Sequence, residues 1–388
     1  RPEFALLSPG MYISGTASFS AEIVKNDGYW LQTGGTVDVT TPEGDGVFTS
    51  VDIVQQVGGV CTVDTFHNYG YSYYPMGKAG ELPDQPWDPG LYISGTADFN
   101  ATTVNNYAVV EHGGGSMTVG KFNNYGGEMY YVGAAPASVS EGMPGLYVYG
   151  TADFDASVLV NYGKVSHRDG RLAADRVHNY AGEGGYFPAG GEQPAQSMYF
   201  EGIHVTGGAD FAADEVHNRG SFWQDGGTIS DRAGGMGLFV NYGEAGGYLY
   251  SSPGTFTMGV GPMGTSTAPG ADPASAEFRD HLINYGYFYY FDGVFTGKYE
   301  HRTGFEGFVQ AQDFTAGAGI VNWSEMTNQP WMDITADGPG LSNYGQFEMA
   351  GGTLGGGGVV NEALGSLHTY LHAIVDNDLT NYGDVSTE

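Results

Sequence analysis

Apolar side chains recur at fixed distances around one short sequence word, in which asparagine is usually followed by tyrosine and then by a small residue. The asparagines are Asn26, Asn68, Asn106, Asn124, Asn161, Asn179, Asn218, Asn241, Asn284, Asn322, Asn343, Asn361 and Asn381. The residue two positions earlier is apolar in every case, namely Val24, Phe66, Val104, Phe122, Leu159, Val177, Val216, Phe239, Leu282, Ile320, Leu341, Val359 and Leu379. Since only 41% of the chain is hydrophobic, this pattern is not coincidental and predicts inward-facing positions.

Two further positions in the same frame are also apolar. Four residues after the asparagine stand Trp30, Val110, Val165, Phe222, Phe288 and Phe347, and eleven after it stand Val37, Met117, Leu172, Ile229, Phe295 and Leu354. A glycine follows the asparagine by eight or nine residues, at Gly34, Gly114, Gly170, Gly226, Gly293 and Gly351. An asparagine turn and a glycine turn predict a coil of two arms. The fold expected is an all-β repetitive β-solenoid of stacked β-arches, with about 18–23 residues per coil.

The asparagines are expected to form a ladder along the solenoid. Asparagine tolerates a left-handed backbone in tight turns, and its amide can bond to the asparagine of the next coil. The intervals between asparagines are interpreted as one or two coils each. We expect a single elongated β-solenoid over residues 1–388, with an inserted loop between modules at 245–271, where three prolines occur without a charged side chain.

Composition narrows the fold and the partners. The chain has 66 Gly, 28 Tyr and 21 Phe but only 13 Lys and Arg, which favours strands over helices. Its net charge of −31 argues against nucleic acid or an anionic membrane as partner and makes divalent cations the expected small partners. No apolar run is long enough to insert into a membrane.

One cysteine and two sequence motifs provide information on the cellular location of the protein. Cys61 cannot form an internal disulfide, so it is either a buried thiol or the site of an intermolecular disulfide. Asn100 and Asn322 each begin a glycosylation motif, which suits an exported protein. The location expected is extracellular, at the cell surface.

Candidate chemistry is sparse. His67, His178 and His217 each precede a ladder asparagine, which the repeat explains better than metal binding does. Structural calcium is the one cofactor considered, on the row Asp98, Asp153 and Asp210. An acidic-polysaccharide lyase would need a basic residue such as Arg168 or Arg171 beside a paired acid and base. A solvated loop explains these arginines more simply, so we expect no enzyme, no catalytic residue and no metal site.

An acidic, Gly- and Tyr-rich chain of Asn-Tyr-Gly and Gly-Gly-Thr arches resembles the amyloid-like sheath proteins that stack into hoops around filamentous methanogenic archaea. The resemblance covers residues 11 to 385. It implies a structural protein that self-assembles into an extracellular sheath, tube or filament as a homopolymer, with no active site. The alternatives are a β-helix polysaccharide lyase or hydrolase, and an adhesin passenger domain.

The two ends of the repeat are expected to be the assembly surfaces. We expect no polar cap before Met11 or after the last repeat, in which Val385 continues the apolar pattern. Unpaired strand edges and open core at a terminal coil favour strand addition. The residues expected to meet are Met11, Tyr12, Ile13 and Phe19 of one chain with Leu379 and Val385 of another.

Overall fold

The fold is all-β wherever the computed structural model describes the chain. No helix occurs among the described residues, and the strands pair in parallel with their counterparts in neighbouring coils. This arrangement confirms the repetitive, solenoid-like β fold that the sequence predicts. The described residues are 10–69, 90–125, 145–180, 202–242, 255–258, 276–303, 307–310, 312–371, 373–376 and 378–387.

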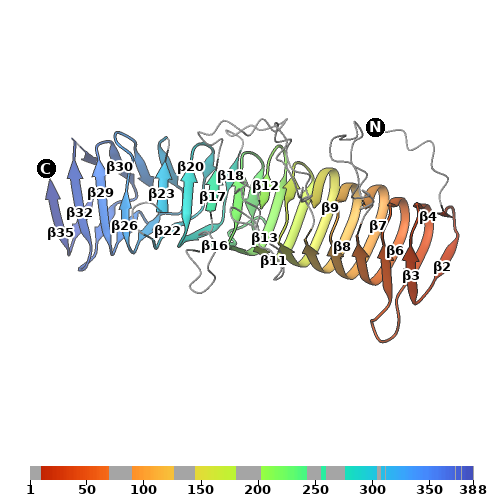
Figure 1. Cartoon of the computed structure of the whole chain (residues 1–388). Coiled ribbons are helices and arrows are strands. Elements are labelled where there is room, and N and C mark those ends of the chain that lie inside the picture. The colour runs from red at the N-terminus through yellow and green to blue at the C-terminus, as the bar shows by residue number, and fades with distance from the viewer. Residues whose placement is uncertain are drawn as a thin grey trace, which may run out of the picture. The chain divides into compact units, whose positions relative to one another are not determined.

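By its internal contacts the chain divides into two compact units, Arg1–Ala173 and Ala174–Glu388. Each unit is itself a β-solenoid. The N-terminal unit contains β1 (Met11–Ile13), β2 (Ser18–Ser20), β3 (Ile23–Asn26), β4 (Trp30–Val39), β5 (Val47–Ser50), β6 (Val54–Asn68), β7 (Leu91–Asn106), β8 (Val110–Asn124), β9 (Leu146–Asn161), β10 (Val165–His167) and the start of β11 (Arg171–Asn179). In Figure 1, β6, β7, β8 and β9 of this unit lie side by side.

The C-terminal unit continues the same architecture with shorter strands. From β24 onwards three parallel sheets alternate along the chain, and β26, β29, β32 and β35 form one of them (Figure 1). The strands are β12 (Ile203–Val205), β13 (Asp210–Asn218), β14 (Ser221–Gln224), β15 (Thr228–Ser230), β16 (Leu238–Asn241), β17 (Thr255–Met258), β18 (Glu277–Phe278), β19 (His281–Asn284), β20 (Tyr287–Tyr290), β21 (Val294–Phe295), β22 (Tyr299–His301), β23 (Phe308–Gln310), β24 (Phe314–Ala316), β25 (Ile320–Asn322), β26 (Glu325–Thr327), β27 (Ile334–Ala336), β28 (Leu341–Asn343), β29 (Gln346–Ala350), β30 (Thr353–Gly356), β31 (Val359–Asn361), β32 (Ser366–Tyr370), β33 (Ile374–Val375), β34 (Leu379–Asn381) and β35 (Asp384–Thr387).

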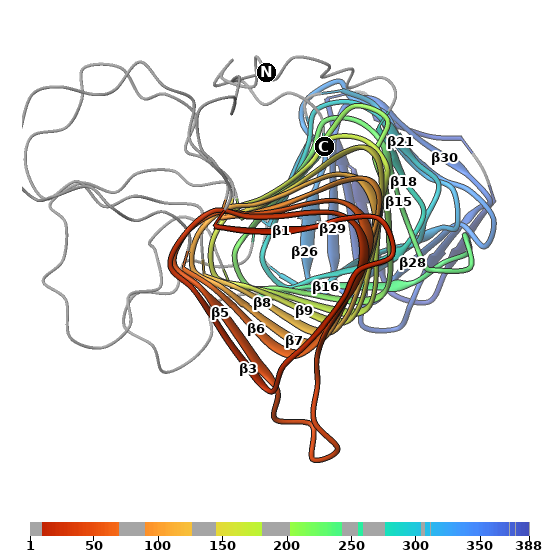
Figure 2. The same ribbon diagram turned by 90° about the vertical axis from the view of Figure 1, so that its right-hand side faces the viewer.

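Each coil has three paired segments rather than the two arms expected. In β7 the segments 91–93, 98–101 and 103–106 pair separately with β8, and the end-on view shows successive coils bending at the same places (Figure 2). The extra corner lies at Thr102, inside a continuous strand. There the buried positions Phe99, Ala101 and Val104 change from a two-residue to a three-residue spacing. The expectation of two arms was wrong because a small buried residue, not a glycine, makes this corner.

At the glycine corner a positive φ occurs at the expected glycine in three coils, Gly170, Gly293 and Gly351, and at the next glycine in the other three, Gly35, Gly115 and Gly227. Gly115 has a φ of +78°, and a Cβ at this position would lie 2.4 Å from the carbonyl oxygen of Ala97 in the neighbouring coil. A side chain would therefore be strained and would also clash. The ladder asparagines differ from expectation, because among the described non-glycine residues only Trp331 and Leu371 have a positive φ.

The number of residues between two ladder asparagines does not by itself give the number of coils between them. Asn68 and Asn106 are paired directly although they lie 38 residues apart, so this interval is one coil. Between Asn26 and Asn68 there are two coils, because Ser50 occupies the asparagine position of the intervening one. His301 does the same between Asn284 and Asn322.

Part of the loop expected at 245–271 is a strand. β17 pairs with β14 on one side and β20 on the other. Phe256 and Met258 are fully buried, and the Phe256 ring stacks on Phe288 at 5.3 Å. Burial alternates from Phe256 to Met258, so this strand completes a coil. The prolines on either side made the strand hard to recognise in the sequence. The rest of 245–271 lies outside the described residues.

The core is made by the three apolar positions found in the sequence. The twelve residues named above at four and eleven positions after the asparagine are buried, but Val385, four after Asn381, is 43% exposed. The residues two before the asparagine are buried except for Leu379, which is 41% exposed. Aromatic rings from successive coils pack edge to face, for example Phe48 with Phe66 at 5.2 Å and Phe66 with Phe99 at 5.4 Å. Such pairs add to the stabilisation from burial.

Candidate functional site

The asparagines form hydrogen-bonded ladders inside each unit. In the N-terminal unit Nδ2 of Asn68, Asn106 and Asn124 donates to Oδ1 of the next asparagine at 2.8, 2.9 and 2.8 Å, ending on Asn161. In the C-terminal unit the same bond joins Asn179, Asn218, Asn241 and Asn284, and again Asn322, Asn343, Asn361 and Asn381. We call each ladder position a rung.

Most of the rung asparagines make a second bond that ties the side chain to the backbone. Nδ2 of Asn106 also donates to the carbonyl oxygen of Gly145 at 2.7 Å, and Nδ2 of Asn343 to that of Ser366 at 3.0 Å. Both amide hydrogens are therefore used while Oδ1 accepts from the preceding rung. A primary amide provides this combination of donors and acceptor on one short side chain, so hydrogen bonding, not a left-handed backbone, accounts for asparagine here.

A second set of polar side chains holds the glycine corner, and sequence reasoning missed it. These residues, which we call clamp residues, stand six positions after a rung and donate to the carbonyl oxygen three residues ahead. They are Gln32, Gln56, His112, His167, Gln224 and Tyr290. The slot accepts several residue types because only a donor of sufficient reach is required. In the sequence, only their constant position six residues after a rung could have identified the clamp residues.

Two of the clamp residues make stability depend on pH. His112 and His167 are fully buried, and burial lowers the pKa of each imidazole from 6.5 to about 4, with the acceptor carbonyls opposing this shift. The neutral ring is thus the native form. Its contribution to stability is complete above pH 6.5 and is lost as the pH falls from 6.5 towards 4.

We expect the double change His112→Gln and His167→Gln to remove most of this acid sensitivity, since glutamine fills the same slot at Gln56 and Gln224. The unmodified chain should lose unfolding free energy between pH 7 and pH 4.5, and the variant should lose less of it, by on the order of 2–3 kcal/mol per site. Denaturant unfolding from pH 4 to 7 measures it. Burial raises the pKa of Asp280 to about 7, so this carboxyl group favours the folded state at low pH. Its effect is the same in the variant and the unmodified chain and therefore cancels when the two are compared. An unchanged pH slope would contradict the assignment.

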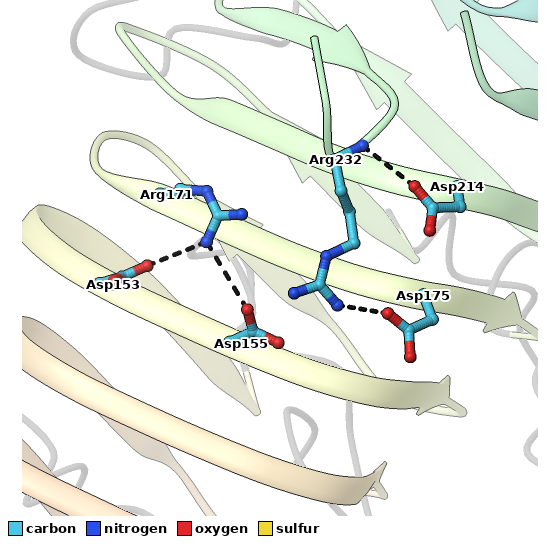
Figure 3. Close-up of polar contacts among 6 residues, drawn as sticks. All are labelled: Asp153, Asp155, Arg171, Asp175, Asp214 and Arg232. Carbon is cyan, nitrogen blue, oxygen red and sulfur yellow. Dashed lines mark hydrogen bonds and ion pairs between the residues drawn. The ribbon is translucent and has the colours of Figure 1, made fainter. Parts of the chain in front are cut away.

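Of the three aspartates considered for calcium, Asp98 and Asp153 are engaged by protein donors, and Asp210 is exposed. Asp98 accepts from Ser116 Oγ at 2.9 Å and from Asn100 Nδ2 at 3.1 Å. In Figure 3, Arg171 reaches Asp153 at 3.1 Å and Asp155 at 3.8 Å. Among the described residues, no group of three or more His, Cys, Asp or Glu has a geometry that could hold a metal ion. Arg171, the cation considered for an acidic sugar, is thus held by carboxylates of its own unit.

A comparable ion pair lies in the C-terminal unit. The Arg232 guanidinium pairs with Asp175, and its backbone N–H donates to Asp214 Oδ1 at 3.1 Å (Figure 3). Asp175 is 57% exposed. Exposed pairs of this kind contribute little to stability.

The three histidines that precede rungs lie on the outer surface. Asn105 Nδ2 is 3.4 Å from His67 Nδ1. The rings of His178 and His217 stack at 5.0 Å, and burial, followed by the charge of His217, lowers the pKa of His178. His217 contacts Glu215 and the Tyr242 hydroxyl, both at 2.8 Å. Repeat position brings His178 and His217 together.

The residues considered for modification differ in access. Cys61 is 5% exposed, and burial raises the pKa of its thiol to about 12, which disfavours an intermolecular disulfide. Asn322 is a fully buried rung whose Nδ2 already makes three hydrogen bonds. It was therefore a wrong choice as a glycosylation site, because a glycan on Nδ2 would break the ladder. Asn100 is partly exposed.

The residues expected at assembly surfaces are distributed over the first and last described coils. Tyr12 is 56% exposed and donates or accepts a hydrogen bond with Thr33, whereas Ile13 is buried and Met11 and Phe19 are partly exposed. Leu379 and Val385 are 41% and 43% exposed. β35 pairs with β32, and every residue of β34 and β35 is exposed.

In many coils the residue after the rung is an outward-facing tyrosine or tryptophan that takes part in an aromatic stack. Tyr69, Tyr107, Tyr125 and Tyr162 of the N-terminal unit form one stack, which we call the tyrosine column. In the C-terminal unit arginine enters the same slot, and the Arg219 guanidinium lies 4.1 Å from the Tyr242 ring centroid. Trp323 and Tyr344 stack at 4.2 Å. Sequence reasoning could not separate displayed from packed tyrosines, and the structure places these on the surface.

None of the described residues lies in a helix that is long and apolar enough to cross a membrane. No protein-family model, no curated protein and no solved structure matches this chain.

Proposed function

We propose that this chain is an extracellular structural protein that assembles with copies of itself by strand addition at the edges of its coils. The observation that carries the proposal is the edge formed by β34 and β35. Leu379, Tyr382 and Val385 are exposed there by 41%, 67% and 43%, next to backbone that pairs with β31 and β32 on one side.

The internal coils show what such an edge can bind. Within each unit the described coils meet through parallel strands, a rung that is asparagine in most coils, and apolar contacts of the same three positions. At the last rung, Asn381 Nδ2 donates only within its own turn, to the carbonyl oxygen of Gly383 at 2.9 Å. A coil from a second chain would supply the acceptors that an internal rung has. β1, with Tyr12 exposed, is the proposed partner strand.

Two observations favour this role over the alternatives. Arg171 is engaged by Asp153 and Asp155, which weakens the case for an acidic-polysaccharide lyase. The tyrosines of the tyrosine column cover one another's faces, which weakens the case for an adhesin that stacks on sugar rings.

Assembly should depend on ionic conditions. A net charge of −31 makes copies repel one another, so we expect salt, divalent cations or a pH near the pI of 4.3 to promote it. Light scattering with negative-stain imaging measures this across salt and pH. Elongated polymers that grow with salt support the proposal. A monodisperse monomer under all these conditions would refute it.

A further inference from the structure

The tyrosine column brings four phenol rings into face-to-face contact. Ring centroids lie 5.0 Å apart for Tyr69 and Tyr107, 5.0 Å for Tyr107 and Tyr125, and 5.3 Å for Tyr125 and Tyr162. The planes deviate from parallel by 4°, 9° and 2°. The column therefore offers three successive tyrosine pairs, each joining two neighbouring coils of one unit.

The backbone holds these rings in place while leaving them accessible. The N–H groups of Tyr107, Tyr125 and Tyr162 each donate to the carbonyl oxygen of the preceding rung at 2.8 Å. Tyr69, Tyr107 and Tyr125 are 41%, 46% and 44% exposed. The ring positions are set by the ladder, yet a reagent in solution can reach the ring edges.

The phenols also influence one another electrostatically. Burial raises the pKa of Tyr107, and the neighbouring phenols of Tyr125 and Tyr69 add to the shift. Tyr107 is thus a neutral phenol near pH 7. Removing an electron from such a ring also releases its phenolic proton, which leaves a neutral phenoxyl radical.

We propose that the tyrosine column is a site of oxidative modification, at which a peroxide acting through a haem peroxidase joins neighbouring coils by o,o′-dityrosine bonds. Two phenols each lose one electron and one proton, and the radicals couple through ring carbons ortho to oxygen. Each ring then moves its ortho hydrogen to oxygen and becomes aromatic again. The peroxide takes up the two electrons and two protons and becomes two water molecules.

The column is distinguished by ring contact between tyrosines of successive coils, whereas the stacked pair Tyr147 and Tyr149, at 4.7 Å, lies within the single strand β9. A radical on Tyr107 has a phenol on each side, so a second oxidation creates a radical pair without diffusion. Small rotations of the exposed side chains bring the ortho carbons together. The bond forms within one chain, so the proposal goes beyond self-assembly and does not depend on it.

The C-terminal unit provides a matched control. Tyr344 and Tyr382 occupy the same slot after a rung, but the neighbouring rungs carry Trp323 and Glu362 there. The Trp323 and Tyr344 rings stack at 4.2 Å, and Tyr382 is 67% exposed. These tyrosines share the backbone setting and accessibility of the column but have no tyrosine on the adjacent rung.

The test is to treat the full chain with hydrogen peroxide and horseradish-type haem peroxidase at low protein concentration, and to map cross-linked peptides by mass spectrometry alongside dityrosine fluorescence. We expect peptides that join Tyr69 to Tyr107, Tyr107 to Tyr125 or Tyr125 to Tyr162, each lighter by two hydrogen atoms. Cross-links found only between other tyrosines, or only between chains, would overturn the proposal.

Variants separate the column from the other tyrosines. Tyr107→Phe with Tyr125→Phe removes all three pairs while keeping the stacked rings, and the dityrosine yield should fall at least about threefold because three adjacent pairs are lost. Tyr344→Phe with Tyr382→Phe should leave the yield unchanged. Equal yields from both double variants would overturn the proposal, and the peptide map of the unmodified sequence tests it even if a variant misfolds.

Discussion

Replacing Asn343 with leucine is expected to lower the melting temperature by about 10 °C, whereas the same replacement at Asn381 should lower it by about 2 °C or less. Asn343 is fully buried, accepts from Asn322 Nδ2 at 2.8 Å and donates to Asn361 Oδ1 at 2.8 Å. It also donates to the carbonyl oxygen of Ser366. Asn381 is the exposed rung of the same ladder.

The size of the effect follows from the groups left behind. Leucine fills a similar volume but leaves the Asn322 donor and the acceptors of Asn361 and Ser366 without a partner in the protein interior. Each buried polar group left unsatisfied costs about 1–3 kcal/mol, which makes a total of roughly 3–5 kcal/mol plausible for the site. At Asn381 water replaces the lost bonds, because that rung is exposed.

Thermal unfolding followed by circular dichroism measures the two shifts, and hydrogen exchange in β28, β29 and β31 shows whether the loss is local. The matched pair isolates burial, because both variants change the same residue type at the same repeat position. Similar shifts at Asn343 and Asn381, or less than about 2 °C at Asn343, would show that the buried amide bonds do not stabilise the coil as argued.

The sequence predicted the ladder positions and the core because both repeat at constant offsets. Phe66, Asn68 and the apolar residues that follow each rung keep their spacing in coil after coil, since a parallel stack places equivalent residues above one another. Burial then selects apolar side chains at those offsets. This is why the inward positions four and eleven after the rung could be assigned without a structure.

Coil boundaries were harder to predict, because two kinds of variation hide them. Ser50 and His301 occupy rungs without being asparagine, so their coils disappear from the pattern. The interval from Asn68 to Asn106 is lengthened without adding a coil. The third corner at Thr102 has no distinctive residue type, because a change in spacing between buried side chains is enough to make it.

The clamp residues were not predicted because chemistry, not residue type, is what they share. Gln56, His112 and Tyr290 are different side chains that each donate to a carbonyl oxygen at the glycine corner. A search for repeated letters cannot group them. The tyrosine column was visible as letters, but its ring contacts depend on which coils are adjacent, and those were misassigned.

Replacing Val385 with proline is expected to abolish polymer growth while leaving the chain folded. The Asp384 N–H donates to the carbonyl oxygen of Gly365, the residue just before β32, at 3.0 Å. Because successive N–H groups of a strand point to opposite sides, the Val385 N–H points away from β32, towards the open edge. Proline removes that donor and places its ring where a partner strand would pair, and proline is tolerated at such edge positions.

Val385→Ala is the matched control, because it shortens the side chain at the same position but keeps the outward N–H. Under the salt conditions that promote assembly, we expect the alanine variant to form polymers and the proline variant to remain monomeric in light scattering and negative-stain images. Both should melt within about 2 °C of the unmodified chain, since Val385 is 43% exposed and its N–H makes no bond to β32. Normal polymers from Val385→Pro would mean that copies meet laterally, and the strand-addition mechanism would then be wrong even if the protein is structural.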